Sequence, residues 1–325
     1  MTFSIVGRSA DGAFGVAVAS KFLAVGAAVP AAEAGVGALA TQSYANLAYR
    51  PHGLAMLRTR VAAADVIAGL TAADPGRATR QLGVVGPDGD GATFTGDECH
   101  AWAGGLVGDG YAIQGNILTG PEVVDAMRDA WVAGVSLPLA RRLMAALLAG
   151  DAAGGDSRGR QSAAIFVVDK GKGYGGTSDI RYDLRVDDHP DPCPEVVRLL
   201  DVHDLLFGSA DPATLLALED GLADEVRGLL GALGHLGAAD ANGLDAALAD
   251  WAGVANLEER MRAGKIDPLV LGELRRAAAA AVAAIAASAA VADGAAAGTV
   301  ADGAAAGTVA DGAAAGTVAD GAAGS

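Results

Sequence analysis

Residues 2–21 read TFSIVGR-SADGA-FGVAVASK, and this stretch decides how the fold begins. Two strand-like runs, 2–8 and 14–20, flank a short segment that contains Asp11-Gly12, a dipeptide typical of tight hairpin turns. An antiparallel hairpin returns the end of its second strand to the start of its first. The sequence therefore predicts that Thr2 and Lys21 lie close together.

Thr2 is the strongest candidate for chemistry. Removal of Met1 would leave a free α-amine on a residue that also carries a hydroxyl, and such a threonine is a known activated nucleophile. The ordinary pKa of an α-amine, about 7.7–8.0, suits a base near neutral pH. Lys21, the first lysine of the chain, would lower the pKa of both groups by like-charge repulsion. The alternatives are a threonine without a role and a solvated lysine at a sheet edge.

The rest of residues 1–209 mixes short apolar runs with segments of helical period. Stacked sheets between helical layers are a stable solution for this order of elements, so we expect an α+β domain. Strands are expected at 27–31, 36–42, 81–86, 91–95, 111–116, 162–168 and 182–186, and helices at 51–73, 121–133, 138–149 and 194–207.

Polar side chains at the ends of these strands are candidates for a substrate pocket. Gln42, Ser43 and Asn46 in TQSYAN (41–46), and Asn116 after a later strand, could bond a substrate amide or an oxyanion. Helix capping and turn formation are the alternatives. Arg160 in GGDSRGRQS (154–162) could hold a carboxylate, or lie in a surface turn.

The C-terminal third differs in composition. Residues 210–276 predict a small all-α module, with helices at 212–234 and 243–252 and helix-start signals at Asp211-Pro212 and Asp267-Pro268. Residues 277–325 contain three copies of ADGAAAGTV, at 292–300, 301–309 and 310–318. This Ala/Gly-rich tail lacks the large apolar side chains of a core and predicts a disordered or weakly helical extension.

Composition excludes several classes of function. A net charge of −16 argues against nucleic-acid binding and against docking to anionic membranes. MTFSIVGR lacks the features of a secretory signal, so we expect a cytoplasmic protein. Cys99 and Cys193 form no zinc or disulfide pattern and are expected to be inert thiols, a single optional disulfide being the alternative. No cofactor and no metal are expected, although DDHPDP (187–192) has the composition of a metal cluster.

Longer motifs resemble domain-of-unknown-function family 1028 (DUF1028) over about residues 1–209. The resemblance lies in TFSIVGR, GVAVASKFLAVGAAVP, EAGVGALATQSYAN, RQLGVV, QGNILTGPEVVDAM, GGDSRGRQSAAIFVV and DLRVDDHPDP. It implies an N-terminal nucleophile (Ntn) hydrolase-like fold, a four-layer αββα sandwich, in which Thr2 stands where the nucleophile belongs. Lys21 resembles in role the lysine of proteasome-like members. WAGVANLEERMRAGKIDPLVLGELRR (251–276) resembles a peptidoglycan-binding-like domain that often follows this family.

These observations favour an Ntn-type amidohydrolase that cleaves a small amide, cyclic amide or peptide-like bond. Thr2 and Lys21 would do the chemistry, and the polar side chains named above would line the pocket: Gln42, Ser43, Asn46, Asn116 and Arg160. Open sheet edges are compatible with a homo-oligomer. One alternative is a non-catalytic binding or assembly protein with the same fold and the helical module. A weaker alternative is a metal-dependent hydrolase built on DDHPDP.

Overall fold

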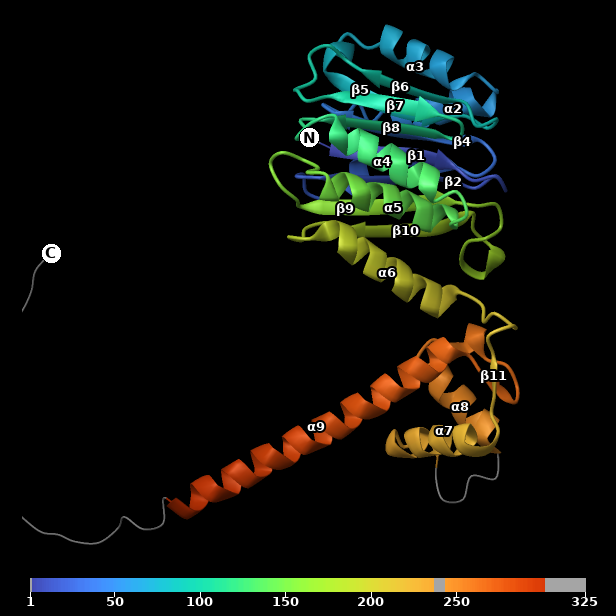
Figure 1. Ribbon diagram of the computed structural model, residues 1–325, viewed down its shortest axis with the longest axis vertical. Helices are drawn as coiled ribbons and strands as arrows, with labels where there is room; N and C mark the ends of the chain where they lie inside the picture. Colours follow the sequence, from blue (N-terminus) through green and yellow to red (C-terminus); the bar gives the residue numbers. More distant parts are fainter. Residues whose placement is uncertain (1, 237–242, 302–325) are drawn as a thin grey trace, which may run out of the picture. The chain divides into compact units, whose positions relative to one another are not determined.

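The computed structural model describes residues 2–236 and 243–301, and Figure 1 traces the chain. The chain divides into two compact units, residues 1–208 and 209–325. The first unit is mixed α/β with antiparallel sheets, and the second is a helical region with one short strand pair.

The first unit contains two sheets, of six and four strands. The six-stranded sheet has the order β10-β9-β2-β1-β8-β7, and the four-stranded sheet has the order β3-β4-β5-β6. Phe3 lies opposite Ala19 in the β1–β2 pair, which confirms the predicted hairpin. Gly12 takes a φ of 94° in its turn, a left-handed conformation that costs glycine little. The strands are β1 (Thr2–Arg8), β2 (Phe14–Ser20), β3 (Pro30–Glu33), β4 (Gly37–Ser43), β5 (Arg80–Val85), β6 (Gly91–Thr95), β7 (Gly104–Gly108), β8 (Tyr111–Asn116), β9 (Ser162–Val168) and β10 (Ile180–Val186).

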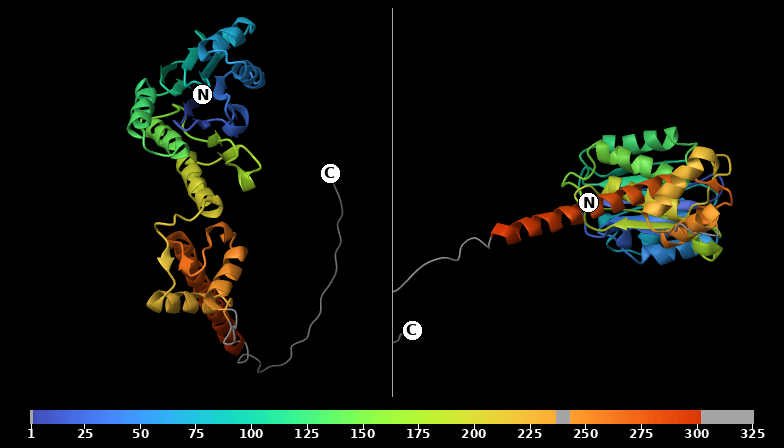
Figure 2. Two further views of the ribbon diagram at one scale, coloured as in Figure 1. Left: turned by 90° about the vertical axis from the view of Figure 1, so that its right-hand side faces the viewer. Right: turned by 90° about the horizontal axis from the view of Figure 1, so that it is seen from below.

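Helices cover the outer face of each sheet. In the right-hand view of Figure 2, α4 and α5 (green) lie on one side of the strands, and α2 and α3 (blue) lie on the other. Phe3 and Ile5 of β1 pack in one apolar cluster with α4, α5 and α6, whereas Leu39 of β4 and Leu82 of β5 pack in another with α2 and α3. The helices of this unit are α1 (Val25–Ala28), α2 (Tyr49–Arg58), α3 (Ala63–Ala72), α4 (Glu122–Ala133), α5 (Leu139–Ala152) and α6 (Pro192–Phe207).

A third apolar cluster lies between the two sheets. Val6 of β1 and Val16 of β2 meet Ala38 of β4 and Val85 of β5 there. Successive side chains of a strand point to opposite faces. The positions of β1 therefore alternate between the helix-covered face (Phe3, Ile5) and the space between the sheets.

The expected helix at 51–73 is wrong, since two helices, α2 and α3, occupy this stretch. Arg60 has a φ of 64°, which a continuous helix does not permit. The next helix begins at Ala63, whose N–H donates to the carboxylate of Asp90, in the turn before β6, 2.5 Å away. The local sequence also gave no signal for β7, whose glycines pair with β8.

The second unit corrects two further expectations. The helix predicted from 212 begins at Asp220 instead, because residues 216–217 form a strand, β11 (Leu216–Ala217), that pairs with β12 (Lys265–Ile266). The boundary at 276 is not a structural break, since one helix runs from Pro268 to Ala301. Residues 302–325, which hold the last nonapeptide and all but the first residue of the one before it, lie outside the described residues. The helices are α7 (Asp220–Ala232), α8 (Gly243–Val254) and α9 (Pro268–Ala301).

Asp204 of α6 ties three elements of the first unit together. Its carboxylate accepts hydrogen bonds from Arg141 of α5 and, at 2.8 Å, from the hydroxyl of Tyr182 on β10. Burial alone would raise the pKa of Asp204, but the donors around it outweigh burial and lower the pKa from 3.8 to about 2. The carboxylate therefore stabilises the folded state fully above about pH 4, and this contribution is lost as the pH falls through about 2.

We expect Asp204→Asn to melt at a lower temperature than wild type at neutral pH, and to lose less stability than wild type between about pH 4 and pH 2. Thermal unfolding followed by circular dichroism across this range measures both effects. Asp201→Asn is the matched control, because Asp201 also contacts Arg141 but is largely exposed. Equal acid sensitivity in wild type and Asp204→Asn would contradict the assignment.

Candidate functional site

The space between the sheets is apolar at one end and polar at the other. On β1 the inward side chains change from Val6 to Ser4 and Thr2, as the two-residue period requires. The other central strands change at the same end of the sheets. The buried polar side chains there are Thr2, Ser4 and Ser20 of the six-stranded sheet with Gln114 and Asn116, and Gln42 and Gln81 of the four-stranded sheet. Five strands thus build one buried polar layer around the start of β1.

Thr2 lies in this layer and is only 5% exposed. Its hydroxyl oxygen lies 3.1 Å from that of Ser20. Its carbonyl oxygen accepts hydrogen bonds from the side-chain amides of Gln42, at 3.2 Å, and Asn116, at 3.4 Å. Three of the predicted residues, Thr2, Gln42 and Asn116, are therefore brought together. The side-chain N–H groups of Gln42 and Asn116 donate to the carbonyl oxygen of Thr2 and do not point into open space.

Lys21 lies one residue beyond β2. The hairpin places Ser20, not Lys21, against the Thr2 hydroxyl. The exposed Lys21 ammonium donates to the backbone carbonyl of Arg160, 3.2 Å away, so these two predicted residues meet each other. The backbone N–H of Lys21 donates to a carboxylate oxygen of Asp156 at 2.7 Å, which anchors the turn after β2.

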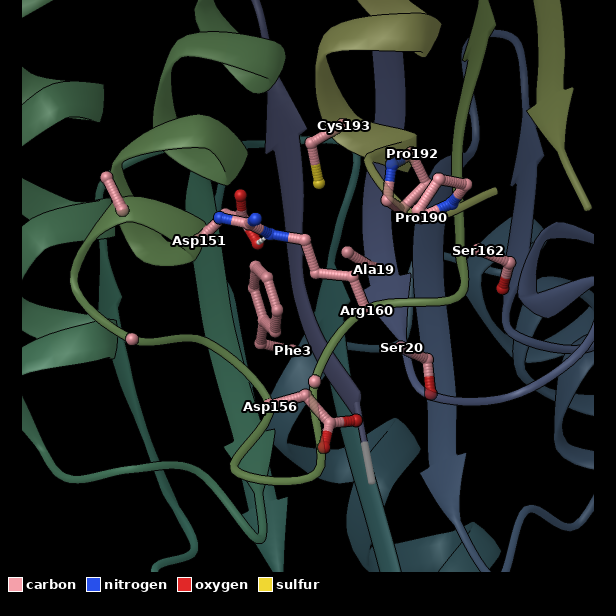
Figure 3. A pocket seen from close by; sticks show the side chains of 13 residues that line it. Phe3, Ala19, Ser20, Asp151, Asp156, Arg160, Ser162, Pro190, Pro192 and Cys193 are labelled. Carbon is pink, nitrogen blue, oxygen red and sulfur yellow. Dashed lines mark hydrogen bonds and ion pairs between the residues drawn. The ribbon is translucent and has the colours of Figure 1, made fainter. Parts of the chain in front are cut away.

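A cavity of about 410 Å³ adjoins Ser20 and Phe3 (Figure 3). Asp151, Asp156 and Arg160 supply its charged groups. The side chain of Arg160 extends toward Asp151, and its Nε donates to that carboxylate at 2.8 Å. Burial raises the pKa of the Cys193 thiol, which lines the same cavity and so remains protonated at neutral pH. Apolar side chains such as Phe3 and Pro192 share the lining with these charged groups, and Ser20, the hydrogen-bond partner of the Thr2 hydroxyl, is part of it.

Comparison with known proteins identifies the family. The model of the "Family of unknown function (DUF1028)" matches residues 2–196. The chain belongs to DUF1028. A crystal structure of a DUF1028 protein from Silicibacter pomeroyi is 30% identical, with a TM-score of 0.57, and the match covers 69% of this chain and 92% of that one. No curated protein matches the chain.

Two other matches accompany the DUF1028 domain. Residues 206–274 match the family described as "Putative peptidoglycan binding domain". The chain also matches Anbu (ancestral beta-subunit) from Yersinia bercovieri, with 13% identity and a TM-score of 0.28, over 62% of this chain and 96% of that one.

Asn46 does not join the polar layer of the DUF1028 domain. Its side-chain amide donates to the buried carboxylate of Asp74 at 3.1 Å, together with the Tyr49 hydroxyl at 2.8 Å and Arg80 Nε at 2.9 Å. The hydrogen bond from Arg80 is the largest cause of a lowered pKa of Asp74, and the hydrogen bond from Asn46 is the second largest. Asp74 holds Asn46 beside a second cavity, of about 490 Å³, lined by residues of α2 and α3.

Ser43 also lies apart from Thr2. It ends β4, and its hydroxyl is 3.6 Å from the thiol of Cys99.

The part of the chain that the structure describes contains no group of three or more histidine, cysteine or acidic side chains that could hold a metal ion. In DDHPDP, the Nδ1 of His189 accepts the backbone N–H of Asp191 at 3.0 Å.

No helix among residues 2–236 and 243–301 has the length and apolarity needed to cross a membrane.

Four side chains of the polar layer, and the carboxylate that anchors the turn beside it, are not among the residues predicted from the sequence. These residues are Ser4, Ser20, Gln81, Gln114 and Asp156. A signal was present in each strand: one polar residue replaces an apolar one at the inward position, as in RQLGVV and YAIQGN. Only the pairing of the strands shows that these substitutions fall at the same end.

Proposed function

We propose that the DUF1028 domain of this chain is an Ntn-type amidohydrolase with Thr2 as its nucleophile, and that its two sheets with their helices form the αββα sandwich of that group. One observation carries the proposal. Thr2, the first residue of the central strand β1, is held by hydrogen bonds at both its hydroxyl and its carbonyl, and its hydroxyl partner Ser20 lines a cavity that also holds charged groups. A reacting group held in one geometry needs little further ordering to react.

The reaction begins once Met1 has been removed. The α-amine of Thr2 takes the proton of the Thr2 hydroxyl, and Oγ1 attacks the substrate carbonyl carbon. The resulting ammonium gives its proton to the leaving nitrogen as the C–N bond breaks, which leaves an ester on Oγ1. Water, activated by the same amine, then hydrolyses the ester and restores the free threonine. No redox partner or further reactant is required.

The neighbouring residues take supporting roles in this proposal. Lys21, next to Ser20 in sequence, adds positive charge that favours the neutral form of the amine. Gln42 and Asn116 hold the backbone of Thr2, a role that replaces the oxyanion contacts expected from sequence. The half-exposed Arg160 offers its guanidinium to a carboxylate on the substrate, in competition with Asp151. The substrate class is a small amide, cyclic amide or peptide-like compound.

The proposal requires a free 1,2-amino alcohol at Thr2, which two reagents test. Periodate cleaves such a group on an N-terminal threonine, with loss of acetaldehyde and ammonia. A peptide epoxyketone forms a ring with both the amine and the hydroxyl of a nucleophilic N-terminal threonine. We expect the folded protein to take up one equivalent of epoxyketone by intact mass, and prior periodate treatment to prevent this. The proposal would be overturned if Met1 is retained. It would also be overturned if Thr2 has a free α-amine but is not labelled by the epoxyketone. Retained Met1 would favour a binding or assembly role instead.

A further inference from the structure

Gln81 of β5 is the hub of the buried polar layer. Its side-chain oxygen accepts two hydrogen bonds, from Gln42 at 2.8 Å and from Asn116 at 2.9 Å. These are the same two amide groups that donate to the carbonyl oxygen of Thr2. All three amide side chains are at most 1% exposed, so water does not replace these contacts at low cost.

The orientation of the Gln81 amide follows from its backbone partners. Its Nε2 lies 2.6 Å from the carbonyl oxygen of Gly115 and 3.3 Å from that of Gly104. A carbonyl oxygen only accepts, so the end of the amide that faces it must be the NH2 group. The oxygen of Gln81 therefore faces Gln42 and Asn116, and it can be satisfied only by their N–H groups.

This arrangement uses up the donors of both neighbours. A side-chain NH2 group has two N–H bonds. In Asn116, one of them reaches Gln81 and the other reaches the carbonyl of Thr2. In Gln42, one reaches Gln81, and the other lies between the carbonyl oxygens of Thr2, at 3.2 Å, and Gln114, at 3.3 Å. The oxygen of Gln42 accepts the hydroxyl of Ser4 at 2.6 Å, which fixes the same orientation from the opposite end. Gln81, on the four-stranded sheet, thereby sets the direction of both N–H bonds that hold Thr2 on the other sheet.

We propose that Gln81 is a positioning residue for Thr2, which it fixes through the paired amides of Gln42 and Asn116 without touching the substrate. This inference rests on the proposed function. The layer contains no ionisable side chain among these contacts, so its role is geometric and not a transfer of protons. Loss of the oxygen of Gln81 would free the Asn116 amide to rotate and would remove one of the acceptors that align the Gln42 amide, so the carbonyl of Thr2 would be held more loosely.

Gln81→Met tests the proposal, because methionine nearly matches glutamine in shape but makes no such hydrogen bonds. Gln114→Met is the matched control. Gln114 is equally buried and bonds Ser4 at 2.6 Å, yet its side chain makes no hydrogen bond to Gln42, Asn116 or Thr2. The readout is the rate of epoxyketone labelling as a function of pH, with periodate cleavage as a measure of how accessible the free amino alcohol is.

We expect Gln81→Met to lower the maximal labelling rate roughly tenfold to a hundredfold, a range typical of a misplaced reacting group. The midpoint of the pH profile and the periodate rate should stay at their wild-type values, whereas unfolding would raise the periodate rate. Gln114→Met should label close to the wild-type rate. Gln81→Asn, which keeps the amide but shortens its reach, should shift the rate in the same direction if Gln81→Met does not fold.

The possible failures are distinguishable. If wild type is not labelled, the proposed function fails. If wild type is labelled and Gln81→Met labels equally fast, the positioning role is wrong while the nucleophile stands. Equal losses in Gln81→Met and Gln114→Met would likewise overturn the positioning role, because they would show that any buried amide of the layer has the same effect.

Discussion

Thr2→Ala is expected to abolish turnover of any amide that the wild-type protein hydrolyses. The substitution removes the atom that would attack the carbonyl. The other inward hydroxyl of β1, that of Ser4, donates to the side-chain oxygen of Gln42 and has no α-amine of its own to act as base. Removal of a nucleophile lowers kcat by several orders of magnitude in hydrolases that work through a covalent intermediate. Thr2→Ser keeps the hydroxyl and should retain measurable turnover.

The measurement is a screen of amides and cyclic amides with wild type, Thr2→Ala and Thr2→Ser side by side. Thr71→Ala is the matched control, because Thr71 is a buried threonine of α3 whose hydroxyl donates to the backbone carbonyl of Ile67 and to no residue of the polar layer. Each Ala variant loses one buried hydroxyl, at a cost of about 1 kcal/mol in stability for each lost hydrogen bond. Full turnover in Thr2→Ala would show that Thr2 is not the nucleophile.

The beginning of the fold could be predicted because its signals are local. The Asp11-Gly12 turn and the two strand-like runs on either side lie within 20 residues, and the observed register follows from them. The helix at 51–73 failed for the opposite reason. Its break at Arg60 depends on the contact between Ala63 and Asp90, which no helical pattern contains. Leu216 likewise lies in the stretch predicted to be a helix, 212–234, but it pairs with Ile266, fifty residues later.

The site shows the same division between local and distant signals. The hairpin returned β2 to Thr2, but the hydroxyl of Ser20, one residue before the expected lysine, makes the contact. A polar residue at the end of a strand is a candidate for the site, which predicts Gln42 and Asn116, and both do reach Thr2. The same rule predicts Asn46, which is held by Asp74 instead. A position at the end of a strand identifies a residue as a candidate for the site. The packing of one sheet on the other decides which of these candidates contact each other.

Asp267→Ala is expected to destabilise the second unit more than any exposed substitution in it. Arg260 Nη1 lies 2.6 Å from a carboxylate oxygen of Asp267, and both side chains are buried. The other oxygen accepts the backbone N–H of Leu269 at 2.8 Å, at the start of α9. Removing one member of a buried ion pair costs about 3–5 kcal/mol, because the remaining charge stays out of water.

Hydrogen exchange followed by mass spectrometry localises this loss within the full chain. We expect faster exchange in peptides from α7, α8 and the first turns of α9 in Asp267→Ala, and unchanged exchange in peptides from β1 and β2. Glu225→Ala is the matched control, since Glu225 forms an exposed ion pair with Arg275 and exposed pairs contribute little. Asp267→Asn keeps an acceptor for Leu269 but loses the charge, so it separates the two roles of this carboxylate. If Asp267→Asn exchanges as slowly as wild type, the cap of α9 and not the ion pair stabilises the unit, and the buried Arg260 must be satisfied by other groups.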